Sequence, residues 1–108
     1  MIPVVNLQQR MNALTATWSP VDIAIVNDQV MRLALIEGEY HWHRHANEDE
    51  LFYVLEGEIV IQVRNEPDIP LHAGEMAVIP KGVEHRPTSA GPSYILMFEP
   101  RALKSSGD

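Results

Sequence analysis

Two stretches of sequence decide the fold: GEYHWHRHANEDE at residues 38–50, with Gly57 shortly after it, and GEMAVIPKGVEH at residues 74–85. Alternate side chains of a β-strand lie on one face, so His43 and His45 can point together at a single ion. Imidazole and carboxylate are good ligands for Zn, Mn, Fe, Ni or Cu. The sequence therefore predicts one divalent transition metal, held by the side chains of His43, His45, Glu50 and His85.

These stretches resemble the paired motifs of the cupin superfamily. The first family motif is Gly, five residues, His-x-His, three or four residues, Glu, six residues and Gly. The second is Gly, five residues, Pro-x-Gly, two residues, His, three residues and Asn. The chain matches the first motif from His43 to Gly57 and the second from Gly74 to His85. The resemblance covers about residues 21–99.

The chain departs from the family pattern at two positions. Only four residues separate Gly38 from His43, and Ser89 stands where the family usually has Asn. Neither position is a metal ligand in the family, so the departures affect loop geometry more than the metal site. The resemblance implies an all-β fold, a double-stranded β-helix or jelly-roll barrel, with a bound metal. It implies no single reaction, because cupins include isomerases, dioxygenases, decarboxylases, lyases, sensors and storage proteins.

Composition narrows the class of protein. The chain has 108 residues, enough for one domain with a single core, and its formal charge of -7 argues against nucleic acid as a partner. Its first residues lack the charged flank and apolar run of a signal peptide, and no apolar run approaches the ~20 residues of a membrane span. The absence of cysteine leaves histidine and carboxylate as metal ligands. We therefore expect a cytoplasmic protein that does not contact a membrane.

The sequence divides into three segments. Residues 1–20 form an N-terminal segment that we expect to pack on the barrel or on a partner, with a short helix or turn at 6–14. Residues 21–99 form the barrel, and residues 100–108 form a polar, flexible tail. Turn residues at 56–57 and at 89–92 are among the predicted breaks between strands. The predicted strands are 21–26, 30–36, 40–44, 51–55, 58–64, 76–79, 85–87 and 93–99.

A tight turn at residues 56–57 would pair the strands on either side of it, and alternation would then sort their side chains onto two faces. The outward face is too apolar for a sheet exposed to water. We expect a second subunit to cover it, which makes the protein a homodimer; the N-terminal segment is the alternative cover. The inward face holds Glu50, Phe52, Val54, Ile59, Ile61 and Val63, and the outward face holds Leu51, Tyr53, Leu55, Val60 and Gln62.

His41 is a further candidate on the side of the metal. On a continuous strand it shares a face with His43 and His45, about 7 Å from His43. It is a candidate acid or base, with an exposed histidine at a strand end as the alternative. The basic neighbours Arg44 and Arg86 should point away from the metal, whereas a phosphate site usually has a cation beside it. We therefore expect a small, partly apolar ligand that offers one or two oxygens to the ion.

Three functions are compatible with these observations. The first is a metal-dependent enzyme that acts on a small organic acid or sugar derivative, as an isomerase, a lyase or a dioxygenase. The second, the alternative, is a non-catalytic cupin in which the ion anchors or senses a small ligand. The third is a purely structural metal site, which is disfavoured because three histidines and one glutamate leave coordination positions open.

Overall fold

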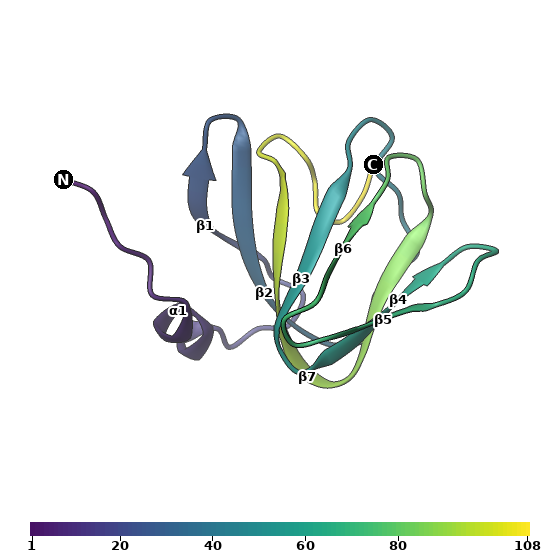
Figure 1. Ribbon diagram of the computed structural model, residues 1–108, viewed down its shortest axis with the longest axis horizontal. Helices are drawn as coiled ribbons and strands as arrows, with labels where there is room; N and C mark the ends of the chain where they lie inside the picture. Colours follow the sequence, from purple (N-terminus) through teal and green to yellow (C-terminus); the bar gives the residue numbers. More distant parts are fainter.

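Short apolar runs between turn residues form seven strands in the computed structural model, which describes residues 1–108 (Figure 1). One helix, α1 (Leu7–Ala13), precedes them, and Asn6 caps it by accepting a hydrogen bond from the backbone N–H of Gln9 (2.9 Å). This all-β architecture with a short N-terminal helix is the predicted one. The strands are β1 (Val21–Val26), β2 (Gln29–Glu39), β3 (Glu50–Glu56), β4 (Glu58–Val63), β5 (Ile69–His72), β6 (Met76–Ile79) and β7 (His85–Pro100).

The long strand β7 joins two antiparallel layers. One edge of β7 pairs with β2, from Glu39 opposite Thr88 to Gln29 opposite Pro100. The other edge pairs first with β4 over residues 85–88 and then with β3 over residues 94–98. The first layer has the strand order β1-β2-β7-β3-β6. The second layer contains β5 and β4, and β4 pairs with the start of β7. Figure 1 shows that these strands enclose a barrel, with the C-terminus among the loops at one end.

The predicted tight hairpin at residues 56–57 is wrong. β3 pairs with β6 and β7, and β4 pairs with β5 and β7, so the chain crosses between layers at this corner. Gly57 lies here with φ +94°, and a Cβ would collide with the side chain of Ser93, so the corner requires glycine. The alternation of side chains survives the change of partner. All six predicted inward residues of β3 and β4 are buried.

Two further strand predictions were wrong, and one strand was missed. Residues 40–44 are not a strand, although His43 makes an isolated bridge with His85. Residues 89–92 do not interrupt β7, which runs through them while β2 accommodates the irregularity with a register shift after Ile36. β5 was not predicted, because Pro70 and the surrounding turn residues conceal a four-residue strand on the edge of the sheet.

Two apolar clusters stabilise the fold. The inner cluster contains 11 buried side chains between the layers, Phe52 and Ile61 among them. The outer cluster lies on the opposite face of the first layer, where Met11 of α1 packs with Leu33 and Leu96. The half-buried Tyr53 and Leu55 pack against this outer cluster, so the N-terminal segment covers part of the outward face. α1 has only seven residues, and it is neither long nor apolar enough to cross a membrane.

Candidate metal centre

The fold brings the four predicted ligand residues together. His43 and His45 lie on the loop between β2 and β3, Glu50 begins β3, and His85 begins β7. All four are buried, and one ligand atom from each lies within 4.8 Å of the others, so the group could hold a metal ion. Two backbone hydrogen bonds between His43 and His85, of 3.0 and 2.9 Å, fix the loop against β7.

Backbone carbonyls orient two of the imidazole rings. His43 Nδ1 lies 3.0 Å from the carbonyl oxygen of His41, and His85 Nδ1 lies 2.9 Å from that of Val83. Because a carbonyl can only accept, each Nδ1 carries the proton and each Nε2 presents a lone pair. Neither Nε2 has a hydrogen-bond partner, although both are buried. This is the arrangement of ligand histidines whose far nitrogen is anchored by the protein.

Glu50 contributes the negative charge of the group. Its Oε1 lies 3.2 Å from His45 Nε2 and 3.6 Å from His85 Nε2, and its Oε2 has no partner. Buried polar atoms without partners are rare in folded proteins and need a physical reason. The unpartnered nitrogens of His43 and His85 and the free oxygen of Glu50 belong to one group, so a cation there would satisfy all of them. The donor set therefore fits a transition metal.

Electrostatics keep these groups in ligand form. Burial lowers the pKa of His43 to about 4, so its imidazole is neutral at pH 7. Burial alone would raise the pKa of Glu50, but the neighbouring imidazoles of His45 and His85 outweigh it and lower that pKa to about 2. The centre thus combines neutral imidazole with one carboxylate, which suits a divalent cation.

Glu99 and Arg32 extend the centre, and neither is among the residues predicted from the sequence. Glu99 is 1% exposed and lies beside Glu50; burial, followed by the neighbouring Glu50 carboxylate, raises its pKa to about 8. Its Oε1 accepts hydrogen bonds from Arg32 (2.8 Å) and Ser105 (2.7 Å). The alternation of side chains could have revealed both residues. Arg32 shares the inward side of β2 with Val30, and Arg32 in β2 and Glu99 in β7 each interrupt an apolar inward row.

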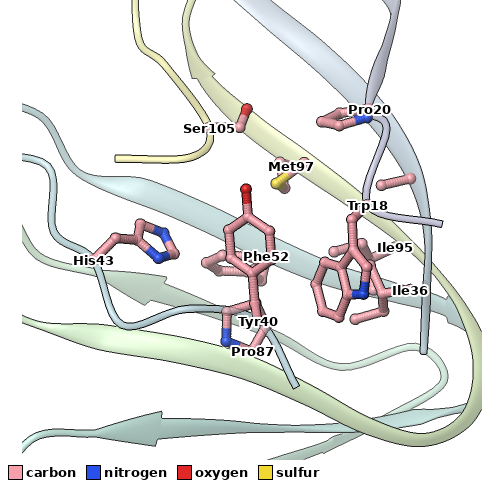
Figure 2. Close-up of a pocket in the computed structure, with 11 residues that line it drawn as sticks. Trp18, Pro20, Ile36, Tyr40, His43, Phe52, Pro87, Ile95, Met97 and Ser105 are labelled. Atoms are coloured by element: carbon pink, nitrogen blue, oxygen red, sulfur yellow. The ribbon is translucent and has the colours of Figure 1, made fainter. Parts of the chain in front are cut away.

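An apolar chamber lies beside His43 (Figure 2). Trp18 stacks on Tyr40 with ring centroids 4.7 Å apart, and Figure 2 shows the Tyr40 ring between His43 and Trp18, with its hydroxyl toward Ser105. The volume open to water in the chamber is about 30 Å³, enough for one or two molecules. No arginine or lysine contributes to its wall. The lining residues are Trp18, Pro20, Ala34, Ile36, Tyr40, His43, Phe52, Pro87, Ile95, Met97 and Ser105.

His41 lies outside this chamber. Its side chain is exposed, and its Nε2 lies 2.7 Å from the carbonyl oxygen of Ser106. The next residue, Trp42, points away from the ligands, with the guanidinium of Arg64 at 4.0 Å and that of Arg86 at 5.0 Å from its ring centroid. Arg86 therefore faces away from the centre, as alternation predicts.

Comparison with known proteins identifies the family to which the barrel segment is similar. The model of the cupin domain matches residues 29–99. An uncharacterised Bacillus subtilis protein, YdbB, is 42% identical over 84 residues, which cover 78% of this chain and 74% of YdbB. The 3-hydroxyanthranilate 3,4-dioxygenase of Xanthomonas euvesicatoria is 37% identical over 73 residues, and the match spans 65% of this chain but only 40% of the dioxygenase.

Solved structures show the same fold. A cupin-2 domain protein from Shewanella frigidimarina superposes with a TM-score of 0.88 at 45% identity, covering 91% of this chain and 95% of that one. A hydroquinone 1,2-dioxygenase from Sphingomonas superposes with a TM-score of 0.81 at 22% identity, covering 94% of this chain and 33% of that one. At that identity the second likeness shows the fold alone.

Proposed function

This chain belongs to the cupin family, and from that premise we propose that it is a metal-dependent enzyme acting on a small organic molecule. His43, His45, Glu50 and His85 would hold one divalent transition metal. The observation that carries the proposal is the buried, unpartnered state of the ligand atoms of His43, Glu50 and His85. A metal that prefers six ligands would keep positions for a substrate oxygen beside these four, whereas four protein ligands would complete a tetrahedral zinc site.

The walls of the chamber favour one of the two proposed classes of substrate over the other. The lining is mostly apolar, and only Tyr40, His43 and Ser105 bring polar side chains to it. A polyhydroxylated sugar would leave most of its hydroxyl groups without partners there, which costs free energy. Of the substrates proposed from the sequence, a small organic acid therefore suits the chamber better than a sugar derivative.

The metal, the backbone carbonyls and the apolar walls would each have a different role in catalysis. A divalent metal bound here supplies Lewis acidity, and iron adds the capacity to activate dioxygen. The carbonyl oxygens of His41 and Val83 hold the ligand rings in place. The apolar walls exclude water, which strengthens electrostatic interactions at the reacting atoms. Among isomerase, lyase and dioxygenase activities, similarity to a 3-hydroxyanthranilate dioxygenase favours the last.

Two measurements test this proposal. Elemental analysis of protein purified without a histidine tag should find one transition metal per chain. Protein reconstituted with Fe²⁺ should then consume oxygen when supplied with a member of a panel of hydroxylated benzoic acids. Absence of any stoichiometric metal would overturn the metal centre, and a metal-loaded protein that converts no member would count against the dioxygenase activity.

The alternative is a cupin that binds a small ligand without converting it. The small volume of the chamber, enough for one or two waters, favours this alternative, because it leaves little space for reactants to rearrange beside the metal. Calorimetric titration of metal-loaded protein with the same panel separates the two functions. Binding without product, detected by mass spectrometry, would support the alternative.

We also propose that the protein is a homodimer. α1 covers only part of the outward face, and Met76 and Val78, which lie opposite Tyr53 and Leu51, remain 57% and 53% exposed. The segment before α1 extends away from the barrel (Figure 1), and its residues Ile2 and Val4 are 91% and 93% exposed. Apolar surfaces of this kind are typical of protein interfaces. The expected cytoplasmic location also stays a prediction, which cell fractionation would test.

The acid–base role of His41 stays a proposal as well. In the structure its Nε2 contacts the carbonyl oxygen of Ser106, so the ring reaches the chamber only if the C-terminal residues move. The variant His41→Gln should keep the metal and lower turnover by the ~10²–10⁴-fold typical of general acid–base groups. Unchanged turnover would remove His41 from the mechanism.

A further inference from the structure

The C-terminal residues, which the sequence predicts to be flexible, follow a defined path across one end of the barrel. Residues 101–108 lie outside the segment matched by the cupin domain. They leave the end of β7, pass Arg32 and reach the loop that carries His43. Figure 1 shows this yellow segment curving over the barrel toward the loop between β2 and β3. We call residues 101–108 the strap.

Arg32 holds the first half of the strap. Its guanidinium donates to the carbonyl oxygens of Arg101 (3.0 Å) and Leu103 (2.7 Å) and to the hydroxyl of Ser105 (3.2 Å). The same guanidinium donates to Glu99, which lies beside the candidate ligand Glu50. The strap is therefore connected to the metal centre by side chains as well as by the backbone.

The second half of the strap rests on the ligand loop. The backbone N–H of Asp108 donates to the carbonyl oxygen of Arg44 (3.0 Å), and its carboxylate accepts from the N–H of Ala46 (2.6 Å). Gly107 packs so closely on His43 that a Cβ there would lie 2.6 Å from the His43 Cβ. The strap thus covers the ligand loop from outside.

A groove on the surface lies next to the chamber. It has a volume of about 420 Å³ and is lined by Trp18, Tyr40 and the strap residues 103–106. Trp18, Pro20, Tyr40 and Ser105 line both spaces, so they form the wall between groove and chamber. The chamber holds one or two waters, whereas the groove is large enough for a small organic molecule.

The strap is the part of this wall that can move. The walls contributed by β2, β3 and β7 belong to the inner cluster and to the sheet ladders, whose displacement would break many contacts. The strap instead contributes one buried apolar side chain, Leu103, and is otherwise held by hydrogen bonds, several of them to solvent-exposed partners. Segments with little apolar burial open at low free-energy cost.

We propose that the strap is a lid over the metal centre, and that it opens at the groove beside Trp18 and Tyr40 to admit the ligand. The stacked Trp18 and Tyr40 rings favour a small, flat ligand that slides along them and offers an oxygen to the centre. With the strap closed, such a ligand has no space to enter. This inference rests on the proposed function, because it assumes that the centre binds a metal and a small molecule.

Release of zinc tests the lid. Zinc-loaded protein is mixed with the chromophoric chelator 4-(2-pyridylazo)resorcinol, and the rate of zinc transfer is followed by absorbance. Deletion of residues 105–108 should speed release at least about 10-fold, and Asp108→Ala about threefold, since each loosens the strap. Ser106→Ala is the matched control, because Ser106 contacts His41 through its backbone carbonyl alone.

The outcomes separate the lid from the metal site. Each variant should still bind one zinc per chain, which shows that the four ligand residues remain in place. Equal release rates in the wild type and in the deletion variant would overturn the lid. A wild-type protein that binds no zinc or other transition metal would instead overturn the proposed function.

A second measurement does not depend on metal. The chain contains no cysteine, so Ala34→Cys places a single thiol in the chamber wall. Iodoacetamide labelling of the metal-free, folded variant, followed by mass spectrometry, reports how often the chamber opens. Labelling should be several-fold faster when residues 105–108 are deleted and unchanged with Ser106→Ala. Equal labelling with and without the strap would overturn the lid even if no metal binds.

Discussion

The inner face of the barrel wall has polar atoms without partners, whereas the outer face has apolar side chains without cover. On the inner face the apolar side chains are buried, but the polar atoms His43 Nε2, Glu50 Oε2 and His85 Nε2 have no partner. On the outer face few polar groups are buried, but apolar side chains such as Met76 and Val78 are more than half exposed. The missing contacts on each face indicate the kind of partner that the face would bind.

The difference has a simple physical basis. An unpartnered polar atom in a dry interior costs about 1–3 kcal/mol, which a cation can recover by coordination. An exposed apolar side chain costs free energy in proportion to its area, and a second apolar surface recovers it. The inner face is therefore suited to an ion and the outer face to a protein surface.

The largest expected effect is the loss of metal from the inner face. The double variant His45→Ala, His85→Ala removes two imidazole ligands, and we expect the bound metal to fall from one per chain to a trace in elemental analysis. Circular dichroism should still show a folded β protein. His72→Ala is the matched control, because His72 is an exposed histidine away from the cluster. Full occupancy in the double variant would show that the metal lies elsewhere.

Truncation on a single strand compares the two faces directly. In β4, Ile61 is fully buried in the inner cluster, whereas its neighbour Val60 is half-buried on the outside. Ile61→Ala should lower the free energy of unfolding by about 3 kcal/mol, because it leaves a cavity in a packed core. Val60→Ala should cost about 1 kcal/mol or less. Urea unfolding of both variants measures the ratio, and equal costs would contradict the assignment of faces.

These two faces could be predicted from alternation alone, although the strand partners could not. Phe52, Val54, Ile59 and Ile61 are buried whether β3 and β4 pair with each other or with β7, because side-chain direction depends on the local backbone. The choice of partner depends on contacts far apart in sequence. His43 and His45 lie in one cluster, as alternation predicts, although the strand that was expected to hold them is absent.

The strap and the buried pair of Arg32 and Glu99 differ in how far they could have been predicted. Arg32 and Glu99 occupy inward positions of β2 and β7, so the same alternation that identified the apolar rows predicts them. The strap has no apolar period, and its path is set by hydrogen bonds to Arg32 and to the loop at 41–46. A polar segment held mainly through its backbone leaves no pattern in its side chains.

Dimerisation gives the next effect in size. Val78 is 53% exposed on β6, and a carboxylate there would have to lose its water if a second subunit covered it. Val78→Glu should therefore weaken the proposed dimer at least about 10-fold. Ala90→Glu adds the same charge at an exposed site in the groove between β4 and β7 and is the control. Sedimentation equilibrium compares the two variants, and a wild type that is monomeric at tens of micromolar would contradict the dimer itself.

The smallest expected effect concerns Glu99 on the inner face and the pH dependence of stability. Burial, together with Glu50, raises the pKa of Glu99 to about 8, whereas the unfolded chain loses the same proton near pH 4.3. Between these values the folded state binds a proton that the unfolded state has lost. The stability contributed by this group is therefore present at low pH and is lost as the pH rises through about 8.

Glu99→Gln removes this titration while keeping a neutral group of similar size beside Arg32. In metal-free protein, the wild type should lose on the order of 1 kcal/mol more of its free energy of unfolding than the variant does, between about pH 6.5 and about pH 9. His43 does not interfere, because its pKa is lowered to about 4 and its contribution changes only below the ordinary value of 6.5. Urea unfolding at both pH values measures the difference. Parallel pH dependence in the two proteins would mean that the inner face holds Glu99 as a carboxylate, with Arg32 outweighing burial and the charge of Glu50.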